Sequence, residues 1–450
     1  MSTTIDNALR NIAQPKIAGP QTIPLRFVAA IVAGNALEFY DFTTYGFFAV
    51  YIGRTFFPSH SAASSLLLSL GTFGAGFLTR PIGAMVIGPM GDRIGRKPVM
   101  MLTFLLMGIS VAGFALVPSY ARIGIAAPIS VVLLRMLQGF SLGGEVGPTT
   151  AYLIEAAPPH RRGIYGSMQP ASQNLAVLTA GLVGTLLANA LSAQQLQDWG
   201  WRLAVLIGAS VIPLGLIIRR NLPETLHAAD DAALAPDATK GDFTPKEHLR
   251  PYAALILLGL MMLTSATIGT YIRNYMTTYA LTTLHLQATV AFGVTAVAGI
   301  LAALCAPWGG QMSDRFGRKP VMLISTTLVL LSNFPAFWLI QHFRTAFVFY
   351  AAVGWLAALM AIGTGVIIVA LTESLPKNIR SGAVATIYAF AISIFGGSTQ
   401  FILGWLLDVT KNPLVPAYYG TVAAAVGLVA VVLINESSPI KLAMQTQGNV

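Results

Sequence analysis

A polar stretch of nine residues decides the fold, because it occurs twice. Residues 92–100 read DRIGRKPVM and residues 314–322 read DRFGRKPVM, so eight of nine positions are identical at a constant shift of 222 residues. Each copy lies between two long apolar segments. A parallel internal repeat of this kind predicts two similar halves with a site between them.

The composition indicates that this chain is embedded in lipid. Of 450 residues, 55% are hydrophobic and 10% are charged, whereas about a quarter of the residues in an average soluble domain are charged. Apolar stretches of about twenty residues recur from end to end, and each is long enough to cross a bilayer. The runs are continuous, which favours helices over barrel strands, since lipid requires every backbone hydrogen bond to be made internally. We therefore expect an all-α membrane protein.

Other classes of protein fit the sequence poorly. The net charge is +10, but the basic residues form short clusters between apolar segments, so we expect no nucleic-acid partner. Cys305 is the only cysteine, which excludes an internal disulfide and a cysteine metal cluster. The sequence has neither a phosphate-binding loop nor a zinc-hydrolase motif. We expect no cofactor, no metal and no enzymatic activity.

Apolar runs between polar breaks predict twelve spanning helices, near residues 25–50, 66–90, 98–117, 124–153, 164–190, 201–218, 251–280, 288–312, 320–341, 345–371, 381–406 and 416–434. Nineteen lysines and arginines fall on one side of the predicted membrane and five on the other. Because cytoplasmic loops are enriched in these residues, both termini are expected in the cytoplasm. We expect an N-terminal six-helix bundle over 1–218, a cytoplasmic linker over 219–250 and a C-terminal six-helix bundle over 251–450. The polar N-terminus shows no cleavage site, so no signal peptide is predicted.

The residues around the repeat resemble a known family. Residues 88–97 follow the pattern Gly-x-x-x-Asp-Arg-x-Gly-Arg-Lys, and the copy that begins at Gly310 repeats it. This pattern resembles the loop signature of the major facilitator superfamily, which implies twelve transmembrane helices in two six-helix pseudo-repeat bundles. Further stretches resemble its metabolite:proton symporter family, namely GNALEFYDF (34–42), FFP (56–58), RPIG (80–83), RMLQGFS (135–141) and WGWR (199–202).

The resemblance also carries an expectation about the substrate. Members of that family import citrate, other di- and tricarboxylates, shikimate, or zwitterionic osmolytes such as proline and betaine. Residues 167–173, SMQPASQ, look closest to the citrate and tricarballylate symporters. Arg273 and Asn274 stand where we expect uncharged residues, and Pro148 replaces an expected glycine, so an organic anion other than citrate stays open.

The charges in and near the repeated loops are predicted to form gates. Glycine permits a tight turn, and aspartate and arginine can pair with neighbouring helix ends and hold a cytoplasmic gate closed. A second pair is also repeated, because Glu155 precedes Arg162 by seven residues as Glu373 precedes Arg380. The alternative is that these charges only enforce topology. The predicted gating residues are Asp92, Arg93, Gly95, Arg96, Asp314, Arg315, Gly317, Arg318, Glu155, Arg162, Glu373 and Arg380.

Six charges fall inside predicted spans, where each is costly and is expected to face a shared polar interior. They are Glu38, Asp41, Arg80, Arg135, Glu145 and Arg273. The acids Asp41, Glu38 and Glu145 are the predicted proton-coupling residues. The alternative for Asp41 and Glu38 is a static ion pair with Arg80. All six histidines fall in predicted loops, which argues against an imidazole relay within the membrane.

The predicted substrate contacts combine arginines with amides and hydroxyls. Arginine presents a planar fork that matches a carboxylate, and in the fourth predicted helix Arg135 and Gln138 share one face. The competing use of the polar side chains is hydrogen bonding between helices. The predicted contacts are Arg135, Arg80, Arg273, Gln138, Gln169, Ser172, Gln173, Asn35, Tyr45 and Asn274.

These patterns predict a proton-coupled symporter that imports an organic anion, with a di- or tricarboxylate such as citrate favoured. Two alternatives remain open: symport of a zwitterionic osmolyte, and proton-coupled export of a metabolite or drug. The expected partners are the organic anion, protons and the lipid bilayer. We expect a monomer in the plasma membrane, the inner membrane of a bacterium being favoured.

Overall fold

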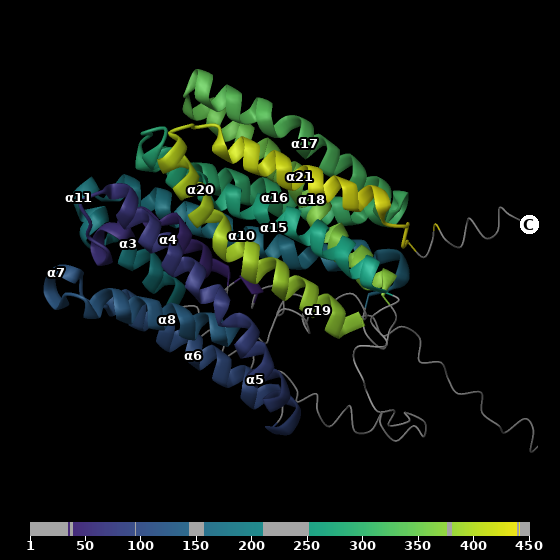
Figure 1. Ribbon diagram of the computed structural model, residues 1–450, viewed down its shortest axis with the longest axis horizontal. Helices are drawn as coiled ribbons and strands as arrows, with labels where there is room; N and C mark the ends of the chain where they lie inside the picture. The colour runs from purple at the N-terminus through teal and green to yellow at the C-terminus, as the bar shows by residue number, and fades with distance from the viewer. Residues whose placement is uncertain are drawn as a thin grey trace, which may run out of the picture.

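The computed structural model describes residues 35–36, 39–94, 96–143, 157–209, 252–375, 380–438 and 441. Within these residues every regular element is helical, and Figure 1 shows the long helices side by side in one elongated bundle. Eight helices of this part are long and apolar enough to cross a membrane, and the shorter Met101–Leu116 and Ala126–Leu142 are also apolar. The prediction of an all-α membrane protein is confirmed.

The first half begins with helical residues 39–47 and ends its described part with helical residues 201–209. Between them lie α3 (Ala49–Phe56), α4 (Ala62–Leu78), α5 (Arg80–Ile94), α6 (Arg96–Leu116), α7 (Tyr120–Ile123), α8 (Ala126–Leu142), η1 (Pro159–Arg161), α10 (Arg162–Ala190), α11 (Ala193–Gln195) and η2 (Leu196–Gly200).

The second half follows the same plan of long helices and short turns. It consists of α15 (Ala253–Thr282), α16 (Ala288–Phe316), α17 (Arg318–Phe343), α18 (Ala346–Ser374), α19 (Arg380–Ala391), η4 (Ile392–Gly396), α20 (Gly397–Thr410) and α21 (Val415–Leu433). The predicted junctions at 218–219 and 250–251 lie outside the described residues, so the boundaries of the two bundles stay a prediction.

The second copy of the repeat does not form the extended loop that the sequence suggested. Asp314 lies in the last turn of α16 and Arg318 in the first turn of α17, with Gly317 alone between the helices. Gly317 has φ +101°, a backbone conformation that residues with a side chain rarely adopt. The turn is therefore one residue long. The assignment of all histidines to loops is also wrong, because α17 runs on to include His342, which stacks on Trp338.

Several helices are interrupted without ending. Pro170, Pro307 and Pro335 lie inside α10, α16 and α17, where each removes a backbone donor and bends the helix. Between α19 and α20, Ile392–Gly396 forms one π-helical turn. Interruptions of this kind are tolerated where neighbouring helices satisfy the freed backbone groups.

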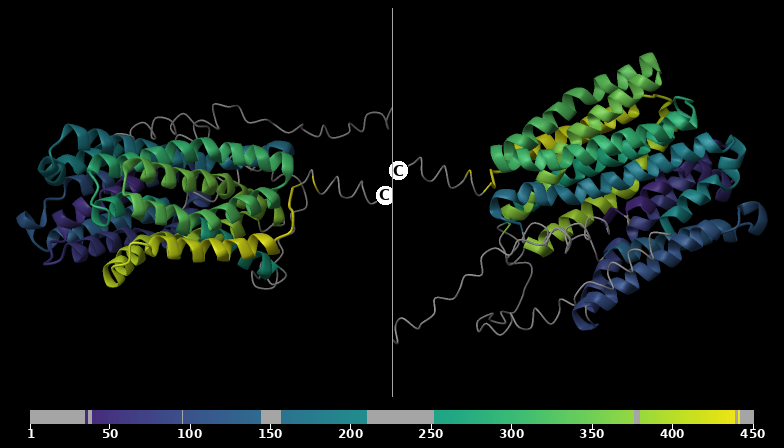
Figure 2. Two further views of the ribbon diagram at one scale, coloured as in Figure 1. Left: turned by 90° about the horizontal axis from the view of Figure 1, so that it is seen from above. Right: turned by 180° about the vertical axis from the view of Figure 1, so that it is seen from behind.

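Among the described residues, several pairs of helices join the halves, including α10 with α16, α10 with α18 and α4 with α20. α10 packs along α16, where a Cβ atom at Gly181 would lie 2.5 Å from the amide nitrogen of Ala296. α4 packs along α20, where a Cβ atom at Gly74 would lie 2.8 Å from the carbonyl oxygen of Gly397. Only small residues let backbones approach this closely. In Figures 1 and 2, α5, α6 and α8 lie on one side of these seams and α17 and α21 on the other.

Candidate functional site

A buried ion pair lies inside the first half. Arg135 on α8 and Asp41 on the first described helix are each 2% exposed, and Arg135 Nη1 lies 3.5 Å from Asp41 Oδ2. Gln138 accepts a hydrogen bond from Arg135 Nη1 and donates one from Nε2 to the same carboxylate oxygen. Residues three apart share a face of α8, so both reach the carboxylate together. We call these three residues the Asp41 unit.

Aromatic rings enclose the cation of the Asp41 unit. The guanidinium carbon of Arg135 lies 3.9 Å from the ring centroid of Tyr45 and 4.9 Å from that of Phe114. The Tyr45 hydroxyl donates to the backbone carbonyl of Ser69 at 3.0 Å. A cation over an aromatic face is attracted more strongly away from water. Tyr45, a predicted substrate contact, thus packs against Arg135 and does not line the pocket between the halves described below.

Arg80, the alternative partner that the sequence allowed for Asp41, lies elsewhere. It is the first residue of α5, and its guanidinium carbon lies 4.3 Å from the ring centroid of Phe77 and 4.8 Å from that of Phe42. Asp41 makes its ion pair with Arg135 instead. Spacing along the chain could not choose between two arginines on different helices, because the choice depends on how α5 and α8 pack around the first helix.

Polar residues of α10 reach the first helix. Asn35 Nδ2 donates to Ser172 Oγ at 2.6 Å and to the backbone oxygen of Gln169 at 3.3 Å. Asn35 and Ser172 therefore make the helix–helix contact that the sequence left as the alternative to substrate binding. The side-chain amide of Gln169 is 2% exposed and has no hydrogen-bond partner at either atom within the described structure.

A pocket of about 50 Å³ lies between the two halves. The first half contributes residues of the first helix and α10, and the second half contributes residues of α15 and α18. It is lined by Phe39, Phe42, Thr43, Pro170, Gln173, Asn174, Val177, Thr270, Tyr271, Arg273, Asn274, Met360, Ala361 and Thr364. We call it the interface pocket. It brings together three of the predicted substrate contacts, Gln173, Arg273 and Asn274.

Arg273 is the charged residue of the interface pocket. It is 9% exposed, and within the described structure its Nε atom has no hydrogen-bond partner and no carboxylate pairs with it. The neighbouring Asn274 leaves its side-chain oxygen without a partner as well. A buried cation without a counter-charge is costly, so this arrangement favours an anionic ligand.

Sequence reasoning missed several polar residues near this region. Thr43, Asn174, Thr270 and Thr364 line the interface pocket. Gln400 on α20 is 1% exposed, has no hydrogen-bond partner at either amide atom among the described residues, and reaches Gly46 of the first helix. An amide within an apolar run was the available signal for Gln400. Nothing in the spacing marks Asn174 or Thr364, because only the rotation of their helices turns them inward.

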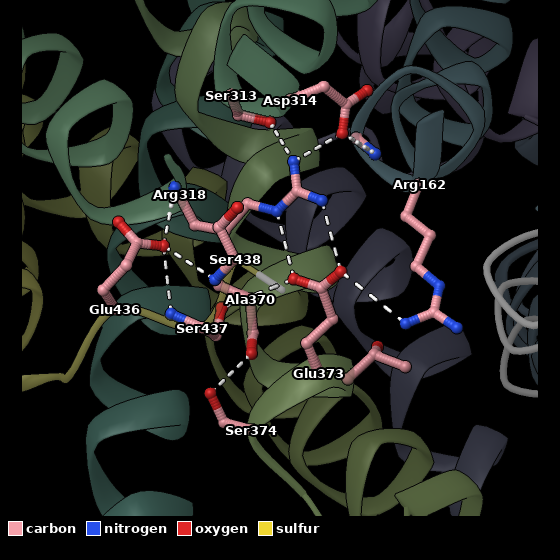
Figure 3. A network of polar contacts seen from close by, with 12 residues as sticks. Arg162, Ser313, Asp314, Arg318, Ala370, Glu373, Ser374, Glu436, Ser437 and Ser438 are labelled. Carbon is pink, nitrogen blue, oxygen red and sulfur yellow. Dashed lines mark hydrogen bonds and ion pairs between the residues drawn. The ribbon is translucent and has the colours of Figure 1, made fainter. Parts of the chain in front are cut away.

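At one end of the bundle, the second copy of the repeat contacts the first half at the N-terminus of α10. Asp314 accepts hydrogen bonds from the backbone nitrogens of Gly163 at 2.8 Å and Ile164 at 3.1 Å, at the N-terminus of α10. A carboxylate at this position interacts favourably with the helix dipole and satisfies free backbone donors. The contact of the loop aspartate with a neighbouring helix end is therefore present, and Figure 3 shows its surroundings.

Arg318 holds the same end together from within the second half. Its Nη1 lies 2.7 Å from Asp314 Oδ1, and its Nε and Nη2 donate to the two oxygens of Glu373 at 3.0 and 3.2 Å. Glu373 also lies 4.0 Å from Arg162 of the first half. Glu436 accepts from the backbone nitrogens of Arg318 and Lys319 at the start of α17 (Figure 3). We call Asp314, Arg318, Glu373 and Arg162 the end cluster.

The remaining predicted residues are distributed as follows. Arg315 is exposed and lies outside the end cluster. The predicted residues Glu38, Gly95, Glu145 and Glu155 lie outside the described residues, and the side chains of Asp92, Arg93, Arg96 and Arg380 are not described.

Comparison with known proteins identifies the family. The profile of the Major Facilitator Superfamily matches residues 31–391. The chain belongs to this superfamily. This confirms the resemblance inferred from the repeated motif, and it makes the protein a multi-pass membrane transporter, not an enzyme.

Relatives among characterised proteins cover almost the whole chain. A citrate-proton symporter of Klebsiella pneumoniae is 34% identical over 96% of this chain and 98% of its own length. A citrate-proton symporter of Salmonella typhi is 38% identical over 90% of this chain and 93% of its own. A proline/betaine transporter of Escherichia coli K12 is 34% identical over 94% of this chain and 86% of its own.

Solved structures confirm the superfamily fold. A proton:xylose symporter of the superfamily, bound to a bromodeoxyglucose, matches with a TM-score of 0.73 over 92% of this chain and 96% of its own. An inward-open xylose transporter of E. coli matches with a TM-score of 0.71. Both are 18% identical to this chain, so they bear on its fold and not on its substrate.

Proposed function

We propose that this protein is a proton-coupled symporter that imports an organic anion by alternating access, with a di- or tricarboxylate such as citrate as the favoured substrate. The observation that carries the proposal is Arg273, a buried cation without a carboxylate partner in the described structure, on the wall of a pocket between the halves. Two relatives that are citrate-proton symporters support the same choice.

The Asp41 unit is the proposed site of proton coupling. Arg135 supplies the counter-charge of ionised Asp41 and Gln138 donates a hydrogen bond to it, and these partners offset the cost of burying the carboxylate. Protonation of Asp41 removes the counter-charge and leaves Arg135 buried and unpaired, a costly state that a change in helix packing or a substrate carboxylate relieves. Glu38 and Glu145 are further proposed proton carriers.

Substrate charge sets the number of protons required. A trianion carried with one proton retains two negative charges, and moving each charge against an inside-negative potential costs about 2.3 kcal/mol per 100 mV. Three protons make that step electroneutral. Measuring uptake at several membrane potentials therefore gives the stoichiometry directly.

A zwitterionic osmolyte is the second candidate substrate. Phe39, Phe42 and Tyr271 line the interface pocket, and aromatic faces bind quaternary ammonium groups. The proline/betaine transporter of E. coli is 34% identical to this chain. Arg273 would then hold the carboxylate of the zwitterion, and the aromatic rings would hold its cation.

The proposal includes the arrangement of the chain in the membrane. We place both termini and the end cluster in the cytoplasm, on the distribution of lysine and arginine. The bundles over 1–218 and 251–450 would move against each other around the interface pocket, joined by the linker over 219–250. The end cluster would be the cytoplasmic gate, and the transporter would work as a monomer.

Uptake into proteoliposomes tests this function. With labelled citrate and an inward proton gradient, wild-type protein should accumulate citrate, and excess tricarballylate or succinate should compete. The Asp41→Asn variant should lose accumulation driven by the gradient, because the site can no longer release a proton. Asp198→Asn is the matched control, since Asp198 is exposed in η2 and does not line the interface pocket.

Three outcomes count against the proposal. If betaine but no carboxylate inhibits the uptake of labelled citrate, the protein is an osmolyte transporter. Accumulation driven by an outward gradient would indicate export. Unchanged coupling in Asp41→Asn would remove the Asp41 unit from the mechanism.

A further inference from the structure

The second half contains a cavity of its own, apart from the interface pocket. It has a volume of about 70 Å³ and lies among α15, α17, α18 and α21. Its polar lining consists of Ser265, Arg273, Ser325, Thr326, Asn333 and Thr364, and the rest of its lining is apolar or glycine. We call it the inner cavity.

The inner cavity and the interface pocket share a wall. Arg273, Met360 and Thr364 line both spaces. Arg273 belongs to α15, whereas Met360 and Thr364 lie one turn apart on α18. A ligand whose carboxylate binds Arg273 in the interface pocket therefore has the inner cavity next to its charged group.

Charge defines what the inner cavity can accept. Arg273 is the one charged residue among the described residues that line it, and it stands at the shared wall. A second carboxylate deep in the cavity would be buried without a counter-charge, at a cost of several kcal/mol. The side-chain nitrogen of Asn333 already donates to Ala417 and Thr421, and the Ser325 hydroxyl donates to Met322. An uncharged arm, apolar or with a hydroxyl group, suits this lining.

Met360 is the movable part of the wall. A thioether side chain is unbranched and flexible, so it adapts to the shape of its surroundings. It lies against Gly269 of α15, where an added Cβ atom would overlap the Cε atom of Met360. A side chain at position 269 must therefore displace Met360. A shorter side chain at position 360 must enlarge the inner cavity and the interface pocket.

We infer that the inner cavity is a specificity subsite: the transported organic acid binds Arg273 through a carboxylate and places an uncharged arm past Met360 and Thr364 into the second half. This inference rests on the proposed function and refines its substrate class. Within the proposed class of organic anions, it favours acids that carry an uncharged arm beside their carboxylates. Thr364 already donates its hydroxyl to the backbone oxygen of Met360, so its oxygen is left as an acceptor for the arm.

A series of acids of increasing length tests the subsite. Binding of acetate, butyrate, hexanoate, 4-hydroxybutyrate and succinate would be measured on the full chain in lipid nanodiscs, from the dependence of the melting temperature on ligand concentration. The wild type should bind butyrate and 4-hydroxybutyrate about tenfold more tightly than acetate, the lower end of what one methylene group contributes in a fitted pocket.

Two variants should move the length preference in opposite directions. Met360→Ala should shift the preferred acid from butyrate to hexanoate, and Gly269→Ala should shift it to acetate, each by about tenfold in the ratio of affinities. Met262→Ala and Gly259→Ala are the matched controls, because both residues are buried on α15 and line neither space. They should leave the ratio unchanged. Met360→Leu gives a smaller shift in the direction of Met360→Ala if the alanine variant does not fold.

The outcomes separate this inference from the proposed function. The subsite is disproved if Met360→Ala, Met360→Leu and Gly269→Ala all keep the wild-type length preference while Arg273→Gln still loses carboxylate binding. In that case the anion symporter stands without the subsite. If the wild type binds no carboxylate and Asp41→Asn leaves gradient-driven uptake unchanged, the proposed function falls and the subsite with it.

Discussion

Gln138 forms hydrogen bonds to both members of the buried ion pair between Arg135 and Asp41. Its amide oxygen accepts from Arg135 and its amide nitrogen donates to Asp41, so one neutral side chain satisfies both partners of a buried ion pair. Arg135 also rests on the ring of Tyr45, which fixes the plane of the guanidinium. An ion pair removed from water repays its desolvation only when such additional partners are present. At this scale the amide is as important as the charges.

We predict that Gln138→Leu destabilises the protein and weakens proton coupling. Leucine removes one hydrogen bond from Arg135 and one from Asp41 and leaves only the 3.5 Å contact between them, and a hydrogen bond to a charged group contributes about 1.5–3 kcal/mol. Thermal unfolding in detergent and the pH profile of uptake measure the two effects. Gln287→Leu, at an exposed position before α16, should change neither. Equal melting temperatures for both variants would contradict the assigned role of Gln138.

At the scale of the elements, the contact between α10 and α16 depends on missing side chains. Gly163 and Gly310 face each other so closely that a Cβ atom on either would overlap the backbone of the other. The same approach brings the N-terminus of α10 to the carboxylate of Asp314. Close backbone packing and the carboxylate of Asp314 therefore both stabilise the contact at this end of α10. The two effects can be tested separately.

The first of these tests concerns space. Gly310→Ala should push α10 and α16 apart at this end and lower the uptake rate, because two backbones cannot both move away without breaking the contacts of Asp314. Gly71→Ala is the control at the other seam, since its Cβ atom would lie 3.8 Å from the ring of Phe401, an ordinary contact. Uptake rates and melting temperatures measure the difference. Tolerance of alanine at both positions would show that the close approach is not required.

The second test concerns charge. Asp314→Asn should weaken the contact with the N-terminus of α10 by about 0.3–2 kcal/mol and open this end more often. In a Cys305→Ser background, alkylation of a Ser167→Cys residue reports the opening, because Ser167 is fully buried on α10. The alkylation rate should rise by a factor of about 2 to 30, since each 1.4 kcal/mol corresponds to tenfold. Asp198→Asn, at an exposed position in η2 that lines neither cavity between the halves, should leave the rate as it is.

At the scale of the whole molecule, the two ends of the interface between the halves differ. One end is held by the end cluster, whereas the other holds a cavity of about 450 Å³ between the halves. That cavity is lined by Arg54 of α3, by Asp408 in the last turn of α20, by Lys411 directly after that helix, and by Ala63 and Tyr275. A transporter whose two halves rock against each other must be closed at one end while the other end is open, since a site open at both ends would let solute leak.

We predict that a bulky group in this cavity blocks transport. In a Cys305→Ser background, Ala63→Cys modified with a large thiol reagent should lose most uptake, because the group fills the cavity between the halves, which we propose as the entry path of the substrate. Leu68→Cys is the control on the same helix, since Leu68 is 52% exposed on the outer surface of the bundle. Inhibition at both positions, or at neither, would show that the cavity is not on the substrate path.

The sequence by itself determined the family, the helical membrane fold and the residues that carry charge into the membrane, because composition, apolar run length and a repeated motif are properties of the chain alone. Most helix ends lie within a few residues of their predicted positions, as α10 and α18 show. The acid Asp41 and the cations Arg135 and Arg273 were recognised because charge in an apolar run is costly wherever the helix packs.

Only the tertiary structure decided which of these groups meet. Asp41 pairs with Arg135 and not with the arginine of the next helix, and Arg273 stands between two cavities instead of at the membrane surface. Asp314 finds the backbone of α10, 150 residues earlier in the chain. Such contacts depend on the rotation of each helix and on close approaches at glycines between segments distant in sequence. The periodicity of one helix does not indicate which other helices pack against it.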